Sequence, residues 1–164
     1  MRIGKFYCSS FFIFIFFKIP FYLCRRGVFN NDVKPLNLLI DEKSHEIFVA
    51  DWGLGEFYFW QNQTLSYHVG TRLWKAPELL LGDEHYTYAV DVFAAGVTLA
   101  GLLYRQVHFF RSADNQQQIL SIAEVIGTEE FYDYIQDYNI VLDKEWKRKH
   151  FREVIFNRLK NIFF

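Results

Sequence analysis

The sequence predicts a mainly α-helical chain with one small β-hairpin and a long central buried helix. Two short apolar runs, residues 38–40 and 47–50, are joined by a polar turn, which is a pattern typical of a hairpin. Residues 88–103 are apolar apart from Asp91 and Thr98. A stretch of this kind indicates a helix that is buried on all sides.

Three shorter helices are expected after the hairpin. Residues 77–81 begin with proline and are followed by Gly82, and both are residues that mark helix ends. Residues 112–126 have Asp114 near the start and Gly127 after the end. Residues 129–135 carry acids in the first turn, where they complement the helix dipole. The apolar stripe expected on the helix over 112–126 comprises Ile119, Ile122, Ala123 and Ile126.

The length, net charge and cysteine content of the chain exclude some classes of function. The 164 residues fit one domain or a large piece of one. A net charge of −1 provides no field that would attract nucleic acid or a membrane surface, so we expect no nucleic-acid partner. Cys8 and Cys24 lack metal-ligand spacing, and we interpret them as reduced intracellular thiols.

The chemistry of the chain is concentrated in residues 28–53. Asp32 is followed by Lys34 two residues later and by Asn37 five residues later, and Asp51 comes directly after the second apolar run. The expected hairpin would bring Asn37, before its first strand, near Asp51, after its second strand. Oxygen-bearing side chains gathered in this way suit Mg²⁺, which takes oxygen ligands.

This stretch resembles the catalytic loop and the metal-binding loop of protein kinases. The first motif stands as NNDVKPLN over 30–37, and the second as DWG over 51–53. GTRLWKAPE over 70–78 looks like the end of a kinase activation segment, and DVFAAG over 91–96 is similar to the start of the central kinase helix. Four motifs in this order, at kinase-like spacing, form a specific signal.

Within the kinases, the chain looks like the catalytic alpha subunit of casein kinase II. Trp52 and residues 126–135 and 138–140 carry this closer resemblance. The implied fold is the α+β protein-kinase fold, of which this chain resembles the mainly α C-terminal lobe with its small hairpin. We therefore divide the chain into an atypical apolar segment (1–20), a partial kinase domain (21–143) and a basic amphipathic C-terminal helix (144–164).

The resemblance implies the role of each residue in the catalytic site. Asp32 would be the catalytic base that accepts the proton of a substrate hydroxyl. Lys34 would offset the charge of the transferred phosphoryl group. Asn37 and Asp51 would hold the Mg²⁺ ions that bridge the phosphates of ATP. The implied function is transfer of the ATP γ-phosphoryl group to Ser or Thr in acidic contexts.

Five further residues receive roles from the resemblance. His68, Arg72 and Lys75 fall where casein kinase II-like enzymes carry basic residues that face an acidic protein substrate, and His68 adds charge only when protonated. The alternative interpretation of these three residues is that they are ordinary surface cations. Asp91 would tie the central helix to the backbone of the catalytic loop. Glu78 would pair with an Arg near the end of the domain, and without that partner its burial is costly.

The chain departs from the family pattern near Asp32 and in the nucleotide lobe. Asn30 stands where the family has His, and Asn31 where it has an Arg that often pairs with a phosphate on the activation segment. No G-x-G-x-x-G and no strand Lys in a V-A-I-K context occur in the sequence. Because catalysis requires those parts, we expect this chain alone to be weakly active or inactive. The alternative is a non-catalytic, kinase-derived interaction module or a truncated gene product.

The missing nucleotide lobe also bears on partners and location. Casein kinase II-like enzymes engage their regulatory subunit mainly through that lobe, so we do not expect this partnership. The resemblance implies the cytoplasm and the nucleus.

The two ends of the chain have their own interpretations. Residues 1–20 combine a basic start with the apolar run 6–17, as in a signal peptide. They are a membrane-directing segment, a remnant of a kinase helix or a mis-assigned start, and we favour the last two. We expect membrane association only if residues 1–20 are a membrane-directing segment of the protein. Residues 144–164 are favoured as a docked terminal helix over a membrane- or partner-binding one.

Overall fold

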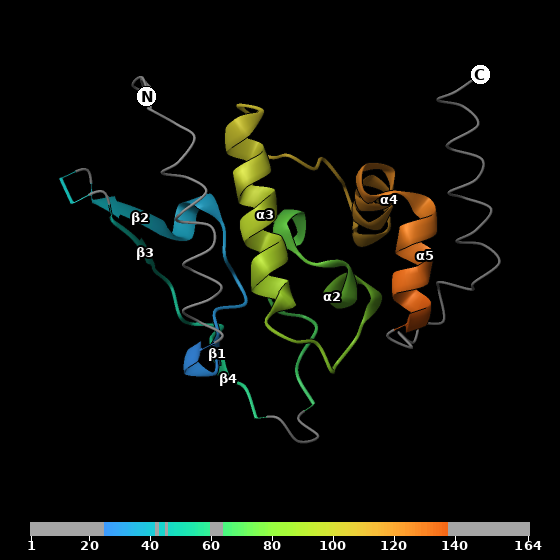
Figure 1. Cartoon of the computed structure of the whole chain (residues 1–164), viewed down its shortest axis with the longest axis horizontal. Coiled ribbons are helices and arrows are strands. Elements are labelled where there is room, and N and C mark those ends of the chain that lie inside the picture. The colour runs from blue at the N-terminus through green and yellow to red at the C-terminus, as the bar shows by residue number, and fades with distance from the viewer. Residues whose placement is uncertain (1–24, 42, 45, 60–63, 138–164) are drawn as a thin grey trace.

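The computed structural model describes residues 25–41, 43–44, 46–59 and 64–137. Helix α3 (Ala89–Leu103) stands at the centre of the molecule (Figure 1). The strands lie on one side of α3, and helices α4 (Asn115–Ile126) and α5 (Thr128–Asp137) lie on the other. The described part is thus mostly helical, as predicted, and it contains two small antiparallel strand pairs, of which one was predicted.

The predictions for residues 1–20 and 144–164 lie outside the described residues, and so does the suggested membrane-directing segment. Within the part of the chain that the structure describes, no helix combines the length and the apolar character needed to cross a membrane.

The predicted hairpin is confirmed. Strands β2 (Leu38–Asp41) and β3 (Glu46–Val49) pair antiparallel, with Leu38 opposite Val49 and Asp41 opposite Glu46. At the base of the hairpin, the backbone N–H of Ala50 donates to the carbonyl of Asn37 over 2.8 Å. The hairpin therefore joins the chain just after Asn37 to the chain just before Asp51.

A second strand pair was not predicted. Strand β1 (Val28–Phe29) pairs antiparallel with β4 (Glu56–Phe57). Strands of two residues are too short to show an alternating pattern in the sequence. This pair closes the segment that contains two loops. Residues 30–37 resemble a kinase catalytic loop and keep that name below, and residues 51–55 are called the Asp51 loop.

Helix α3 has almost the predicted bounds, but the expectation that it is buried on all sides is wrong for the described structure. Val92, Leu102 and Leu103 have exposed fractions of 50%, 46% and 62%. The opposite side of the helix is buried and joins the main apolar core through Ala94, Ala95 and Val97. A uniformly apolar sequence cannot tell which side of a helix its neighbours cover.

The three shorter helices also form. Helix α2 (Pro77–Leu81) is confirmed, and Gly82 ends it in the left-handed conformation with a φ of 87°. Helix α4 begins at Asn115 rather than at residue 112, because the side chain of Asp114 accepts a hydrogen bond from the N–H of Gln117 over 2.8 Å. A carboxylate in this position caps a helix.

The apolar stripe of α4 is only partly correct. Ile119, Ile122 and Ala123 are at most 1% exposed and lie in the core, whereas Ile126 is 46% exposed at the last turn. Helix α5 is longer than predicted, because it extends from Thr128 to Asp137 instead of 129–135.

Candidate active site

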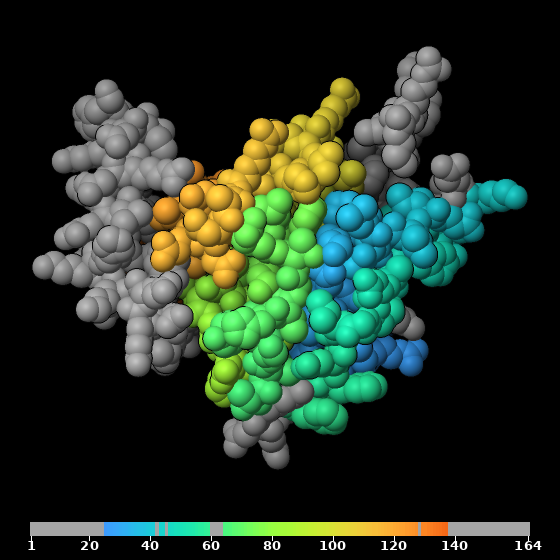
Figure 2. All heavy atoms as spheres, turned by 180° about the vertical axis from the view of Figure 1, so that it is seen from behind, coloured from blue at the N-terminus to red at the C-terminus, as the bar shows by residue number. Residues whose placement is uncertain are grey.

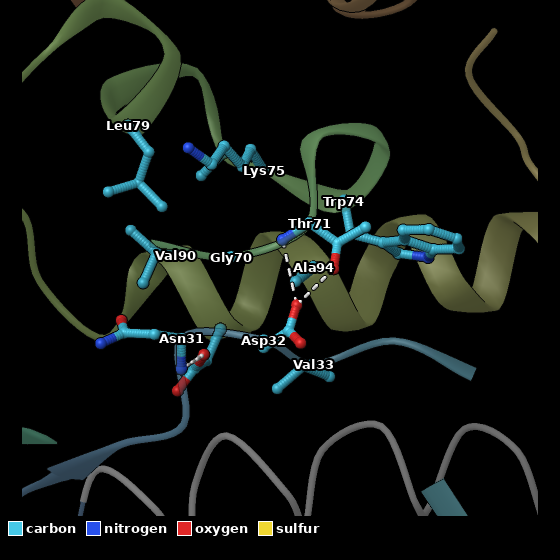
Figure 3. A pocket seen from close by; sticks show the side chains of 12 residues that line it. Asn31, Asp32, Val33, Gly70, Thr71, Trp74, Lys75, Leu79, Val90 and Ala94 are labelled. Carbon is cyan, nitrogen blue, oxygen red and sulfur yellow. Dashed lines mark hydrogen bonds between the residues drawn. The ribbon is translucent and has the colours of Figure 1, made fainter. Parts of the chain in front are cut away.

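The carboxylate of Asp32 lies at the centre of a closed polar network. Lys34 Nζ donates to Asp32 Oδ2 over 2.7 Å, and the backbone N–H and hydroxyl of Thr71 donate to Oδ1 over 3.0 and 2.6 Å. Lys34 Nζ also donates to Thr71 Oγ1 over 2.8 Å. Figure 3 shows Thr71 lying over Asp32, with both of its hydrogen bonds dashed. The carboxylate, the ammonium group and the hydroxyl are therefore held in one fixed arrangement.

The spacing from Asp32 to Asn37 is closed by a local turn. A short 3₁₀ helix, η1 (Pro35–Asn37), begins with proline, whose restricted φ favours the first position of a helix. Asn37 Nδ2 then donates back to the Asp32 carbonyl over 2.9 Å and to Asp32 Oδ2 over 3.1 Å. The five-residue spacing of the sequence motif is thus the length of one tight loop.

Asn37 and Asp51 offer oxygen atoms that suit a magnesium ion. Because Nδ2 of Asn37 is committed to Asp32, its Oδ1 is the atom left for a ligand. The exposed Asp51 has a left-handed φ of 57° and accepts from the N–H of Gly53 over 3.3 Å. Within the described ranges, no three His, Cys, Asp or Glu side chains group to hold a metal ion. One amide oxygen and one carboxylate nevertheless fit Mg²⁺ that keeps water and phosphate ligands.

Asp91 connects helix α3 to the catalytic loop. Its carboxylate accepts the backbone N–H groups of Asn30 over 2.8 Å and of Asn31 over 2.9 Å, and its side chain is buried. Burial raises the pKa of Asp91 to about 6, although the two backbone hydrogen bonds act in the opposite direction. The contact is the one that the sequence resemblance implies for this residue.

The two asparagines before Asp32 connect the catalytic loop to the Asp51 loop. Asn30 Nδ2 donates to the Asp51 carbonyl over 3.1 Å, and Asn30 Oδ1 accepts the N–H of Asp32 over 3.2 Å. Asn31 Nδ2 donates to the Leu54 carbonyl over 3.0 Å. The side chains that depart from the family pattern therefore still join the two loops.

The three residues expected to face an acidic substrate lie in different surroundings. Arg72, in the short 3₁₀ helix η2 (Arg72–Trp74), is exposed, and its guanidinium donates to the Ser112 carbonyl over 3.2 Å. His68 is also exposed. Lys75 is partly buried and donates to the Tyr67 carbonyl over 3.1 Å, and burial lowers its pKa. Two of the three cations are thus accessible, whereas the third is engaged inside the fold.

Glu78 is buried with a neutral partner from another helix. Its side chain is 5% exposed, and burial raises its pKa. Hydrogen bonds from its own backbone N–H and from Tyr134 in α5 partly oppose this rise. Tyr134 thus stabilises the charged form of Glu78. The arginine partner expected from the sequence is not among the contacts of the described residues.

Sequence reasoning missed Thr71 as a member of the site. The backbones of the two loops meet beside it: Gly70 has a φ of 80°, and a Cβ atom there would lie 2.6 Å from the Asn31 carbonyl oxygen. A glycine is required for so close an approach. The sequence signal was the Gly-Thr pair in the third motif. Figure 2 shows the loop around Asp32, in blue, against the segment around Thr71, in green.

The comparison with known families agrees with this geometry. The family model described as "Protein kinase domain" matches residues 20–158. The match includes Asp32, Asp51, Thr71 and Asp91, and covers well over half of the chain. The chain belongs to the protein kinase domain family.

Proposed function

We propose that this chain carries the phosphoryl-transfer site of a serine/threonine kinase similar to casein kinase II-like enzymes. The observation that supports it best is the network of Asp32, Lys34 and Thr71. It places a carboxylate acceptor, an ammonium group and a hydroxyl within 2.6 to 2.8 Å of one another. Phosphoryl transfer depends mainly on such positioning and on charge stabilisation.

Each residue of the site has a distinct task in this proposal. Asp32 accepts the proton of the attacking Ser or Thr hydroxyl. Lys34 stabilises the negative charge that is shared between the phosphoryl group and the attacking oxygen. Asn37 and Asp51 hold Mg²⁺, and bound Mg-ATP supplies the phosphoryl group itself. The hydrogen bonds from Thr71 keep Asp32 in one orientation, which removes the need to order it during the reaction.

The preference for acidic substrates rests on the exposed cations. Arg72 and, when protonated, His68 would attract acidic residues that follow the target hydroxyl. Lys75 can join them only if its amino group exchanges the Tyr67 carbonyl for a substrate carboxylate. We therefore propose Arg72 as the stronger contributor of the three.

The test is a transfer assay with the full chain, Mg-ATP and a peptide in which acidic residues follow the serine. We expect weak transfer that Asp32→Asn abolishes. Asp133→Asn is the matched control, because Asp133 is an exposed carboxylate on α5. Equal transfer by wild type and Asp32→Asn would contradict the assignment of the catalytic base.

A second candidate function is a non-catalytic interaction module. Its supporting observation is the hairpin surface, where Leu39 and Phe48 lie directly opposite each other and are 57% and 53% exposed. Adjacent exposed apolar side chains favour contact with another protein surface. A chain that shows no rise in melting temperature with Mg-ATP, and no transfer, would favour this candidate.

A further inference from the structure

Asn31 has a backbone conformation and a burial that single it out. Its side chain is 5% exposed, and its φ of 64° lies in the left-handed region. That region is costly for most residues and less so for asparagine and glycine. Its backbone N–H is bound by Asp91, and its carbonyl lies against Gly70. Asp91 and Gly70 therefore hold the backbone of Asn31 independently of its side chain.

The side chain of Asn31 is directed to the turn that follows Asp51. Nδ2 donates to the Leu54 carbonyl over 3.0 Å. Leu54 belongs to a tight turn in which the N–H of Gly55 donates to the Trp52 carbonyl over 2.9 Å. No donor in the described ranges reaches Asn31 Oδ1, which is buried.

A small cavity lies beside Asn31. Its volume is about 10 Å³, and Asn31, Gly70, Lys75 and Val90 are among its lining residues (Figure 3). This space is close to the minimum that one water molecule requires.

We propose that Asn31 is a positioning residue that holds the turn 52–55, and with it Asp51, through a neutral hydrogen bond. This inference rests on the proposed function, because Asp51 is the metal ligand it positions.

Two other contacts support a segment, residues 54–69, that is held by internal donors. At its far end, Lys75 Nζ donates to the Tyr67 carbonyl over 3.1 Å, and the Tyr86 hydroxyl donates to the Ser66 carbonyl over 3.1 Å. Donors from the rest of the fold thus bind the backbone of the segment at both ends.

Hydrogen–deuterium exchange of the full chain tests the role of Asn31. In Asn31→Gly the left-handed backbone is retained and only the side chain is lost. We expect exchange in residues 51–57 to become about fivefold faster, as loss of one hydrogen bond implies, with α4 unchanged. Asn115→Gly is the matched control, because Asn115 is an exposed asparagine at the start of α4. It should leave residues 51–57 unchanged.

Asn31→Asp provides a second variant of nearly the same shape. It replaces the donor with a carboxylate oxygen that faces the Leu54 carbonyl, so it should accelerate the same exchange at least as much. Both Asn31 variants should also bind Mg-ATP about fivefold more weakly than wild type. Both variants should also lower the melting temperature slightly, because each loses a hydrogen bond at a buried side chain, and Asn31→Asp should lower it more, because it buries a carboxylate. A purely structural role would lower the melting temperature without this selective loss of binding.

Unchanged exchange in both Asn31 variants would overturn the inference. If wild type binds no Mg-ATP, the proposed function fails, but the exchange results still decide whether Asn31 positions the turn.

Discussion

The region around Asp32 and the helical region of the molecule are held together by different forces. The catalytic loop is positioned by hydrogen bonds that involve side chains. Asn30 donates to Asp91 and to the Asp51 carbonyl, and the N–H of Thr71 donates to Asp32. The helices instead pack apolar side chains, and Ile119, Ile122 and Phe131 are at most 1% exposed. Asp91 is a polar link between the two regions, since it lies on α3 and binds the loop backbone. Val33, next to Asp32, is an apolar link, because it packs in the helical core.

The apolar core supplies stability, and the hydrogen bonds of the loops supply precise positions. Apolar burial is non-directional and provides most of the free energy of folding. Hydrogen bonds contribute less net energy, but they are directional and fix atoms within tenths of an ångström. We therefore expect changes in the helices to act on stability, and changes in the loops to act on catalysis or on pH dependence.

The largest effect is expected in the helical region. Ile119→Ala should lower the free energy of unfolding by about 2–5 kcal/mol, because it leaves a cavity at a fully buried position. Ile119→Val should cost only about 1 kcal/mol. Urea unfolding measures both. Val125→Ala is the control, because Val125 is 59% exposed. A cost for Ile119→Ala no larger than that control would contradict the assignment of the core.

The polar link between the regions should make stability depend on pH. Burial raises the pKa of Asp91 from an ordinary value of 3.8 to about 6, so the folded state retains a proton that the unfolded state has lost. Asp91 therefore contributes stability below about pH 4, and this contribution, about 3 kcal/mol, is lost as the pH rises through 6. Urea unfolding between pH 4 and 7 should show a shallower decline for Asp91→Asn than for wild type. Equal slopes would show that Asp91 does not titrate in this range.

The polar network around Asp32 should respond to the loss of one hydroxyl. Thr71→Ala removes the hydroxyl that donates to Asp32 and accepts from Lys34, and hydrogen bonds to charged groups are worth about 2 kcal/mol. We expect the transfer rate to fall by at least about tenfold, while Thr71→Ser keeps most of it. The transfer assay measures both variants. A serine variant as weak as the alanine variant would implicate the methyl group instead.

The smallest effect should come from the contact between Glu78 and Tyr134. Burial raises the pKa of Glu78, and the Tyr134 hydroxyl partly opposes this by stabilising the charged form. Tyr134→Phe should raise that pKa further and lower stability by about 1 kcal/mol at pH 8, with less effect at pH 4, where the carboxyl is protonated. Thermal unfolding at the two pH values provides the comparison. An equal loss at both would indicate a packing effect.

Much of the fold and part of the site follow from short-range patterns in the sequence. The hairpin, α2 and the bounds of α3 were predicted because alternation, helix-end residues and an apolar run act within a few residues. The geometry of Asp32 and Asn37 is local in the same sense, since one short turn closes their five-residue spacing.

The elements and the motifs could be predicted because they depend on neighbours along the chain. Three contacts could not be predicted in this way. Thr71 completes the site from a position 39 residues after Asp32, Tyr134 binds Glu78, and the Lys75 amino group faces inward. The tertiary structure also decided which side of α3 remains exposed. Contacts of this kind depend on how separate elements pack together, and residue periodicity carries no information about the partner that each face will meet.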